Sequence, residues 1–383
     1  MMMKKSLAII VCLILFSIAG CEFISFDEHN VDEYTGDFTW TQIVKNADWD
    51  NRWDHASLVF NDKLWIIGGY NSGNHGQDPY YEDVWSSEDG ENWTLVLEDA
   101  PWKGRRGHQL ILFENAMYLI GGFYVDEANG YRNYANDVWK STDGEVWIEI
   151  KPIFTPELDS LIDWYPRFNH SCTVAMHGGI NYIYLIGGAT MIPGKSGEYA
   201  VKYFNDVWRS TDGIKWEQMP ANDFGIRSEH ALTVDSATGT LYLQGGIHGR
   251  VFESADQSKQ PIPDWHWLWT STDGVNWIPA NDLDSFNQSY LYRAQHQMMF
   301  YDNFLWTFPG KHTYESHYSK NDNYYTIWKR DDVNNWTIDS HGALFSGRYG
   351  YTLEKFQGNI WILGGVYSYG GPSNDIWKGE YNK

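Results

Sequence analysis

The sequence predicts an all-β protein, a β-propeller of six blades with four antiparallel strands in each, and three observations predict it. First, four anchors follow one another in a fixed order: Arg-x-x-His, Gly-Gly and Asp-Val-Trp occur six times, with a few looser copies, and a closing Trp occurs five times. Second, the runs between the anchors, such as LWIIGG and MYLIGG, are short and rich in β-branched and aromatic residues, as buried strands are. Third, no stretch keeps a helical period, and repeats of this length are typical of propeller blades.

The first anchor places an arginine and a histidine at the start of the first strand of each blade. A residue that binds one ligand has no reason to recur in every blade, whereas a residue that joins each blade to the next must recur. We therefore interpret this set, called the axial ring, as mostly structural. Its members are Arg52, Arg105, Arg167, Arg227, Arg293 and Arg348, with His55, His108, His170, His230 and His296, and with Tyr351 in the sixth copy.

A functional alternative for the six arginines stays open. Six guanidinium groups gathered on one face would suit a carboxylate or phosphate ligand. Nearby acids would instead neutralise them and leave a structural role. The acids closest in sequence are Asp54, Asp223, Glu229, Asp282 and Asp284.

The connections between strands divide into constant and variable ones. Strands are called a to d in chain order within a blade. The turn between strands c and d has one length in five copies and carries an Asp-Gly pair in four of them, which indicates a tight hairpin. The b–c and d–a connections vary in length. Because these two kinds share one face of an up-and-down blade, we expect function on that loop face.

The b–c loops are rich in aromatic residues flanked by amides and acids. Aromatic rings and amides of this kind hold sugars, by stacking and by hydrogen bonds to hydroxyl groups, and protein interfaces use the same residues. The alternative is that the tyrosines only cover the ends of large blades. The candidate ligand-binding residues are Tyr80, Tyr81, Tyr124, Tyr131, Tyr199, Trp265, His266, Tyr314, Tyr318 and Tyr367.

The sixth copy lacks a closing tryptophan, and the missing strand is found at the other end of the chain. GDFTWTQIV resembles the fourth strand of the other copies, and Trp40 precedes Arg52 by the same interval that separates Trp93 from Arg105. We therefore predict that a strand within 36–46 completes the last blade and closes the ring. The propeller spans 36–383, with blades at approximately 52–98, 105–152, 167–221, 227–282, 293–340 and 348–383.

The N-terminus is expected to be a processing signal. MMMKK is a short basic region, and the apolar run after it ends in Ile18-Ala19-Gly20-Cys21, which is similar to a bacterial lipobox. Residues 1–20 would then be a lipoprotein signal peptide, Cys21 the lipidated residue, and 21–35 an acidic tether. The protein would be held in the bacterial cell envelope by lipid alone, on either membrane. An ordinary secretory signal that contains a cysteine is the alternative.

Charge and cysteine content argue against nucleic acid as a partner and against a disulfide. The net charge of -22 argues against nucleic acid, whose phosphates such a surface would repel. After loss of the signal and lipidation, Cys172 would be the one free thiol, so no disulfide is expected. The cluster His312, Glu315 and His317 has metal-binding residue types at weak spacing, so we predict no metal. We expect a monomer without a cofactor.

The repeated anchors resemble kelch repeats over about residues 36–383. The resemblance implies a six-bladed β-propeller with strand a nearest the axis. Blade five departs from the pattern, because it has Phe308-Pro309-Gly310 and no Asp before Ile327. The kelch family includes galactose oxidase, a bacterial sialic acid epimerase and many binding modules, so the fold does not define an activity. The copper site of galactose oxidase needs a Cys–Tyr crosslink, whereas Cys172 is interpreted as core packing.

These observations favour an exported, lipid-anchored recognition module that binds a glycan or a protein through the loop face. One alternative is a carbohydrate-active enzyme of the sugar oxidase or sialate epimerase type. The other is a scaffold of the cell envelope. No motif singles out a catalytic pair of acids, so catalytic residues are not assigned. The STDG-x-x-W turns resemble the Asp-box hairpin of sialidases but are one residue short, and we interpret them as stiff turns.

Overall fold

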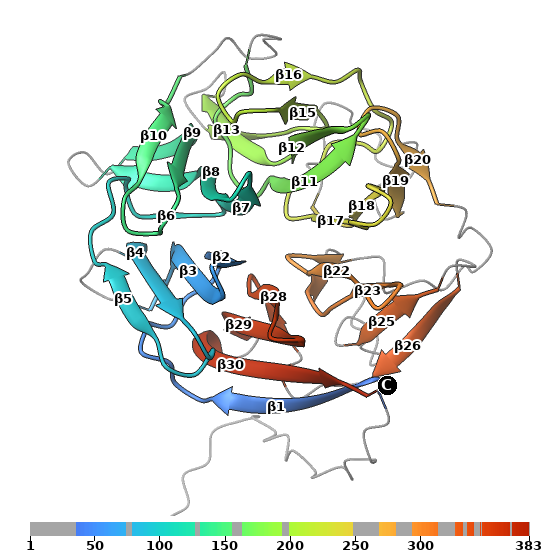
Figure 1. Cartoon of the computed structure of the whole chain (residues 1–383). Helices are drawn as coiled ribbons and strands as arrows, with labels where there is room; N and C mark the ends of the chain where they lie inside the picture. Colours follow the sequence, from blue (N-terminus) through green and yellow to red (C-terminus); the bar gives the residue numbers. More distant parts are fainter. Residues whose placement is uncertain are drawn as a thin grey trace, which may run out of the picture. The chain divides into compact units, whose positions relative to one another are not determined.

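The computed structural model describes residues 36–73, 79–126, 131–154, 163–193, 199–247, 268–280, 293–312, 326–331, 335–340, 345, 347–367 and 370–382. Its regular elements are all β-strands, arranged as six antiparallel blades around one axis (Figure 1). The predicted fold class is therefore confirmed. The described residues contain no helix with the length and apolarity that a membrane span requires. The signal peptide, Cys21 and the tether lie outside the described residues.

The first three blades follow chain order around the ring. Blade one consists of β2 (Ala56–Phe60), β3 (Lys63–Tyr70), β4 (Tyr80–Ser87) and β5 (Thr94–Leu97). Blade two consists of β7 (Gln109–Phe113), β8 (Ala116–Asp126), β9 (Tyr131–Ser141) and β10 (Ile148–Lys151), with β6 (Arg105–Arg106) also on β8. Blade three consists of β11 (Ser171–His177), β12 (Ile180–Ile186), β15 (Val207–Ser210) and β16 (Glu217–Gln218), with the ribbon β13 (Ala189–Pro193) and β14 (Tyr199–Tyr203) in its b–c connection.

The last three blades continue the ring back to the first. Blade four consists of β17 (Ala231–Val234), β18 (Leu241–Gln244), β19 (Trp269–Ser271) and β20 (Ile278–Pro279). Blade five consists of β22 (Met298–Tyr301), β23 (Phe304–Thr307), β25 (Ile327–Arg330) and β26 (Trp336–Ser340), beside the pair β21 (Arg293–Ala294) and β24 (Lys311–His312). Blade six consists of β28 (Thr352–Phe356), β29 (Asn359–Tyr367), β30 (Gly371–Tyr381) and β1 (Phe38–Val44), with β27 (Arg348–Tyr349) also on β29.

The hydrophobic core lies between the blades rather than within one of them. One cluster joins Leu58 and Trp65 of blade one to Leu110 and Met117 of blade two, and equivalent clusters follow around the ring. Each blade is a single sheet and can bury its faces only against its neighbours. Several tryptophans, among them Trp65, Trp147 and Trp208, are buried in these seams, where large side chains bury the most area.

The Gly-Gly anchors are needed because two histidines pack against them. A Cβ atom on Gly121 would lie 2.9 Å from the His170 ring of the next blade, and one on Gly122 would lie 2.8 Å from His108 Cβ in the same blade. Both glycines have positive φ, and the strand register shifts there. The Gly122 N–H also donates to the Arg167 carbonyl, which extends the contact across the seam.

The c–d turns are stiff hairpins, and they also hold the seams. In blade two, the Gly144 N–H donates to Ser141 Oγ and the Val146 N–H donates to Asp143 Oδ1, each at 2.8 Å. The aspartate thus satisfies the turn backbone, as the sequence indicated. A Cβ on Gly144 would lie 2.2 Å from the ring of Trp65, so this turn packs directly on the preceding blade.

The N-terminal strand completes the last blade, as predicted. β1 pairs antiparallel with β30 from Phe38, opposite Tyr381, to Val44, opposite Ile376 (Figure 1). The fully buried Phe38 ring lies 4.9 Å from the Trp306 ring of blade five, in an edge-to-face arrangement. The two ends of the propeller are therefore joined by one sheet without a disulfide.

We predict that Phe38→Ala destabilises the propeller by about 3 kcal/mol or more, because it empties a buried aromatic site at the closure. Urea denaturation followed by tryptophan fluorescence measures this loss. Thr41→Ala is the matched control, since Thr41 is exposed on the same strand, and it should cost less than about 1 kcal/mol. Equal stabilities of the two variants would show that the closing strand does not hold the ring together.

Candidate functional site

A circle of backbone hydrogen bonds surrounds the propeller axis on the loop face. It is formed by the residue that precedes the His or Tyr of each Arg-x-x-His segment, and we call these six residues the mouth ring. In each blade the N–H of this residue donates to the carbonyl of its counterpart in the preceding blade, at 2.8–3.3 Å. The mouth ring consists of Asp54, Gly107, Asn169, Glu229, Gln295 and Gly350.

Every member of the mouth ring has a left-handed backbone, with φ between 49° and 62°. Glycine adopts this conformation without strain and occurs in two blades, whereas other residues are strained there by about 1 kcal/mol or more. The other four positions carry side chains with carboxyl or amide groups. Strained backbone conformations cluster at functional sites. Four strained residues with polar side chains at one place therefore indicate a candidate site.

The polar side chains of the mouth ring contact one another. Gln295 Nε2 donates to Asp54 Oδ1 at 2.8 Å, and Asn169 Nδ2 donates to Glu229 Oε1 at 3.2 Å. A Cβ on Gly107 would lie 2.3 Å from Asn169 Oδ1, so the small residue leaves room for its neighbour. A cavity of about 180 Å³ continues from this ring along the channel between the innermost strands.

Two cations stand beside the two carboxylates of the mouth ring. Arg106 Nη1 lies 3.7 Å from Asp54 Oδ2, across the seam between blades one and two. Lys311 Nζ lies 2.5 Å from Glu229 Oε2, across the seam between blades five and four. Both cations remain partly exposed, while the Asp54 side chain is 7% exposed. The four charges sum to zero when all are ionised.

Aromatic rings border one side of this mouth in a continuous series of contacts. The Tyr349 and Trp53 rings lie 6.0 Å apart, and the series then continues to Tyr70 and beyond in steps of 4.8–5.8 Å. The Arg106 guanidinium lies 5.0 Å from the Trp53 ring and 4.8 Å from the Tyr70 ring. We call this set the aromatic arc; it contains Trp53, Tyr70, Tyr80, Phe123, Tyr134, Phe168 and Tyr349.

Burial shifts the ionisation of two acids at the mouth and in the channel. Burial, partly opposed by Arg106, raises the pKa of Asp54 to about 6, and the charge of Glu229 adds to the shift. Burial also raises the pKa of Glu354, in the channel wall, to about 7. The hydroxyl of Ser57 donates to Glu354 Oε1 at 2.6 Å. The axis therefore contains acids that change charge in the range where most carboxyl groups are already ionised.

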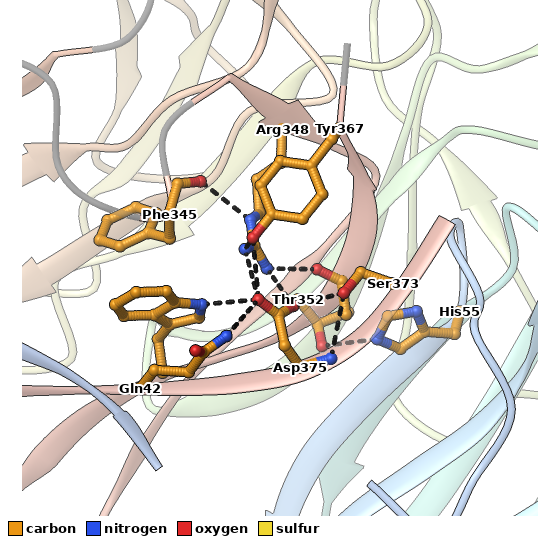
Figure 2. A network of polar contacts seen from close by, with 10 residues as sticks. Gln42, His55, Phe345, Arg348, Thr352, Tyr367, Ser373 and Asp375 are labelled. Atoms are coloured by element: carbon orange, nitrogen blue, oxygen red, sulfur yellow. Dashed lines mark hydrogen bonds and ion pairs between the residues drawn. The ribbon is translucent and has the colours of Figure 1, made fainter. Parts of the chain in front are cut away.

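The arginines of the axial ring are buried and face their own blades. In four blades the guanidinium binds both carboxylate oxygens of the aspartate in the Asp-Val-Trp anchor or its Asp-Ile-Trp copy. Figure 2 shows the pair in blade six, where Asp375 also accepts from the Tyr367 hydroxyl. The four aspartates are Asp83, Asp137, Asp206 and Asp375.

These carboxylates are not the acids nearest in sequence. Asp54 and Glu229 belong to the mouth ring, no ion pair of Asp223 with an arginine is found in the described part of the chain, and Asp282 and Asp284 lie outside it. In blades four and five the arginines bind other oxygens. Arg227 donates to the carbonyls of Gly245 and Phe224. Arg293 donates to the Phe308 carbonyl and to Thr326 Oγ1, each at 3.0 Å.

The histidines of the axial ring lie in the seams. Burial lowers the pKa of His55, His108 and His296 to about 3, so these rings are neutral. His55 Nε2 lies 3.1 Å from Thr352 Oγ1 of blade six (Figure 2). Between blades five and six, where proline replaces the first glycine, the longer Tyr351 donates its hydroxyl to the Pro309 carbonyl at 2.7 Å. The two exceptions in the repeat therefore fit each other.

The tyrosines predicted from the b–c loops have different surroundings. Tyr80 belongs to the aromatic arc, and Tyr199 on β14 is 68% exposed. Tyr81 and Tyr367 cover Arg52 and Arg348, at 4.2 Å and 4.3 Å from the guanidinium carbon to the ring centre. Tyr124 pairs across the sheet with Arg105. The side chain of Tyr131, and all of Trp265, His266, Tyr314 and Tyr318, lie outside the described residues.

Of the residues at the mouth, Tyr80 was predicted to bind a ligand, Asp54 and Glu229 were predicted only as acids near the arginines, and Trp53, Arg106 and Lys311 were not predicted. Trp53 and Arg106 occupy the first variable position of Arg-x-x-His, and Asp54 and Glu229 occupy the second. The signal was present: these two positions differ from blade to blade between two constant residues. Differences between repeats that mark a site therefore lie inside the anchor as well as in the loops.

The absence of a metal site at His312, Glu315 and His317 stays a prediction, whereas the structure describes the surroundings of Cys172. The side chain of His312, and all of Glu315 and His317, lie outside the described residues. Within the described ranges no group of three or more histidine, cysteine or acidic side chains is arranged to hold a metal ion. Cys172 lies in the channel wall, where burial raises the pKa of its thiol.

The site and scaffold together define a six-bladed β-propeller with a polar mouth at one end of its axial channel. No family model matches the chain. The chain is similar to a solved structure titled "Structure of YjhT", with 14% sequence identity and a TM-score of 0.57, over 87% of this chain and 96% of that chain. At this identity the likeness supports the propeller fold alone.

We predict that Asp137→Ala destabilises the protein by about 3 kcal/mol, because it leaves the Arg105 guanidinium charged and buried. Glu145→Ala, an exposed acid in the same blade, is the control and should change stability by less than about 0.5 kcal/mol. The double variant Arg105→Met with Asp137→Leu should recover much of the loss. Urea denaturation at pH 7.5 tests all three, and an Asp137→Ala variant as stable as the control contradicts the prediction.

We also predict that Glu354→Gln is more stable than the parent protein at pH 8 and not at pH 4.5. The folded-state pKa of Glu354 is raised, so its favourable contribution is present below about pH 4.5 and is lost as pH rises through about 7. The amide removes this loss and still accepts from Ser57. Denaturation at the two pH values measures the difference, with the exposed Glu114→Gln as control. An advantage that did not depend on pH would refute the assignment.

Proposed function

We propose that this protein is a recognition module that binds a glycan at the mouth of its axial channel. The observation that carries the proposal is the aromatic arc beside the polar mouth ring. Sugars offer C–H faces that pack on aromatic rings and hydroxyl groups that both donate and accept hydrogen bonds. The arc and the ring supply these two kinds of contact side by side on the loop face.

The hydrogen bonds left unmade at the mouth support a small polar ligand. Asp54 Oδ2, Gln295 Oε1 and the Nε of Arg106 are buried and have no hydrogen-bond partner among the described residues. Buried polar groups without partners cost about 1–3 kcal/mol each, so a ligand that supplies the missing partners gains that energy. Two acceptors and one donor suit hydroxyl groups, which can do both.

The shape of the site favours a glycan end over a flat protein surface. The mouth ring lies above a cavity, and its groups converge on one axis from several blades. Concave sites with a few convergent polar groups are typical of small-ligand binding. The proposal includes export and lipidation at Cys21, for which the support is the sequence of residues 1–21.

We predict that Trp53→Ala and Tyr70→Ala each lower glycan affinity by at least about tenfold, because each removes a ring that borders the mouth. A glycan array probed with the exported chain identifies the ligand, and titration calorimetry measures the variants. Tyr182→Ala is the matched control, since Tyr182 lies on β12, away from the mouth, over Arg209. Its affinity should equal that of the parent protein.

Two results would count against this proposal. The first is an array without any bound glycan. The second is a bound glycan whose affinity falls with Tyr199→Ala and not with Trp53→Ala, which would move the site to the exposed ribbon of blade three. Thermal unfolding of each variant separates lost binding from lost folding.

A further inference from the structure

We propose that Asp54 is a specificity-determining residue that makes the mouth select neutral sugars over acidic ones at neutral pH. This inference rests on the proposed function, because it names the class of glycan that the same site accepts. It concerns the charge of the ligand, whereas the proposal above concerns its hydroxyl groups and ring faces.

The charged groups around Asp54 balance one another. The charged groups that face its carboxylate are Arg106 from β6, Glu229 from the mouth ring and Lys311 from β24. With all four ionised the mouth has no net charge. An acidic sugar would then have to compete with Asp54 for Arg106 and with Glu229 for Lys311. It would also bring its carboxylate close to two others, where like charges repel.

The contact between Arg106 and Asp54 neutralises the guanidinium without a hydrogen bond. The two groups are 3.7 Å apart, which is an ion pair without a hydrogen bond, and the Nε of Arg106 has no acceptor among the described residues. Asp54 thus neutralises the guanidinium and leaves a donor in place. Because the Arg106 side chain is 22% exposed, a neutral hydroxyl group can accept from its guanidinium without displacing the carboxylate. A ligand carboxylate gains little from a cation that is already neutralised.

Protonation of Asp54 reverses this selectivity between neutral and acidic sugars. Its pKa of about 6 means that the carboxyl is mostly neutral at pH 5, whereas the paired cations remain charged. The mouth then loses one negative charge, beside Arg106. A sugar acid stays ionised at pH 5, since such carboxyl groups have pKa values of about 3.5. Acidic sugars therefore gain affinity as pH falls through 6, and neutral sugars do not.

The test compares matched pairs of methyl glycosides: galactose with galacturonic acid, glucose with glucuronic acid, and mannose with mannuronic acid. Affinities are measured by titration calorimetry at pH 7.5 and pH 5. For the parent protein we expect the neutral member to bind at least about tenfold more tightly at pH 7.5, and the ratio to fall by about tenfold at pH 5. Measurements at low and high salt should show the ratio shrinking with screening.

The key variant is Asp54→Asn, which removes the charge and keeps an oxygen that accepts from Gln295. Asparagine already occupies this left-handed position in blade three, at Asn169, so the backbone accommodates it. At pH 7.5 the variant should shift about tenfold toward the acidic sugars and lose its dependence on pH. The control is Asp62→Asn, the same change at an exposed left-handed position in the a–b turn of blade one, on the opposite face.

The outcomes separate this inference from the proposed function. Preference for an acidic sugar by the parent protein at pH 7.5, or an Asp54→Asn variant with an unchanged ratio, overturns the inference and leaves glycan binding intact. Absence of binding to every neutral and acidic probe overturns both. A shift that Asp62→Asn reproduces overturns the inference, because it would then follow from the net charge of the protein.

Discussion

Closure of the ring at the axis is the constraint on which the rest of the structure depends. Six blades contact one another most closely at their innermost strands, where backbone groups would be buried without partners. The mouth ring solves this with one hydrogen bond per seam, from the N–H of one residue to the carbonyl of the preceding blade. That geometry requires a left-handed residue in each blade, and the flanking arginine and histidine are placed by the same requirement.

Each constant residue of the anchor holds the turn from a different side. The arginine binds the carbonyl of the first glycine, or of Phe308 in blade five, and in four blades an aspartate, which fixes the turn within its own blade. The histidine lies against the first glycine of the preceding blade, which fixes the turn across the seam. Pro309 and Tyr351 show that the two sides of one seam depart from the repeat together. Here a hydroxyl-to-carbonyl hydrogen bond stands where the other seams have a histidine ring packed on glycine.

The fold was predictable from the sequence because the same pattern of strands and turns occurs in six copies. Strand order, closure by β1 and the turn chemistry of STDG all follow from patterns that recur. The site was only partly predictable, since Tyr80 was found and Trp53, Arg106 and Lys311 were not. Their convergence depends on how blades one, two, four and five meet at the axis, which no local pattern records. The acids that neutralise the arginines were likewise assigned by nearness in the chain, whereas the sheet brings distant ones together.

Variable side chains that stand between constant residues give this scaffold a site whose geometry is already fixed. A side chain at the mouth ring is held in position by a backbone that every blade needs for closure, so its geometry requires no further support. The strain of four non-glycine residues there is about 1 kcal/mol or more each, and glycine would avoid it. Two of these residues, Asp54 and Glu229, also form the ion pairs with Arg106 and Lys311 that cross two of the seams. The stability of the ring and the chemistry of its mouth are therefore two uses of the same six residues.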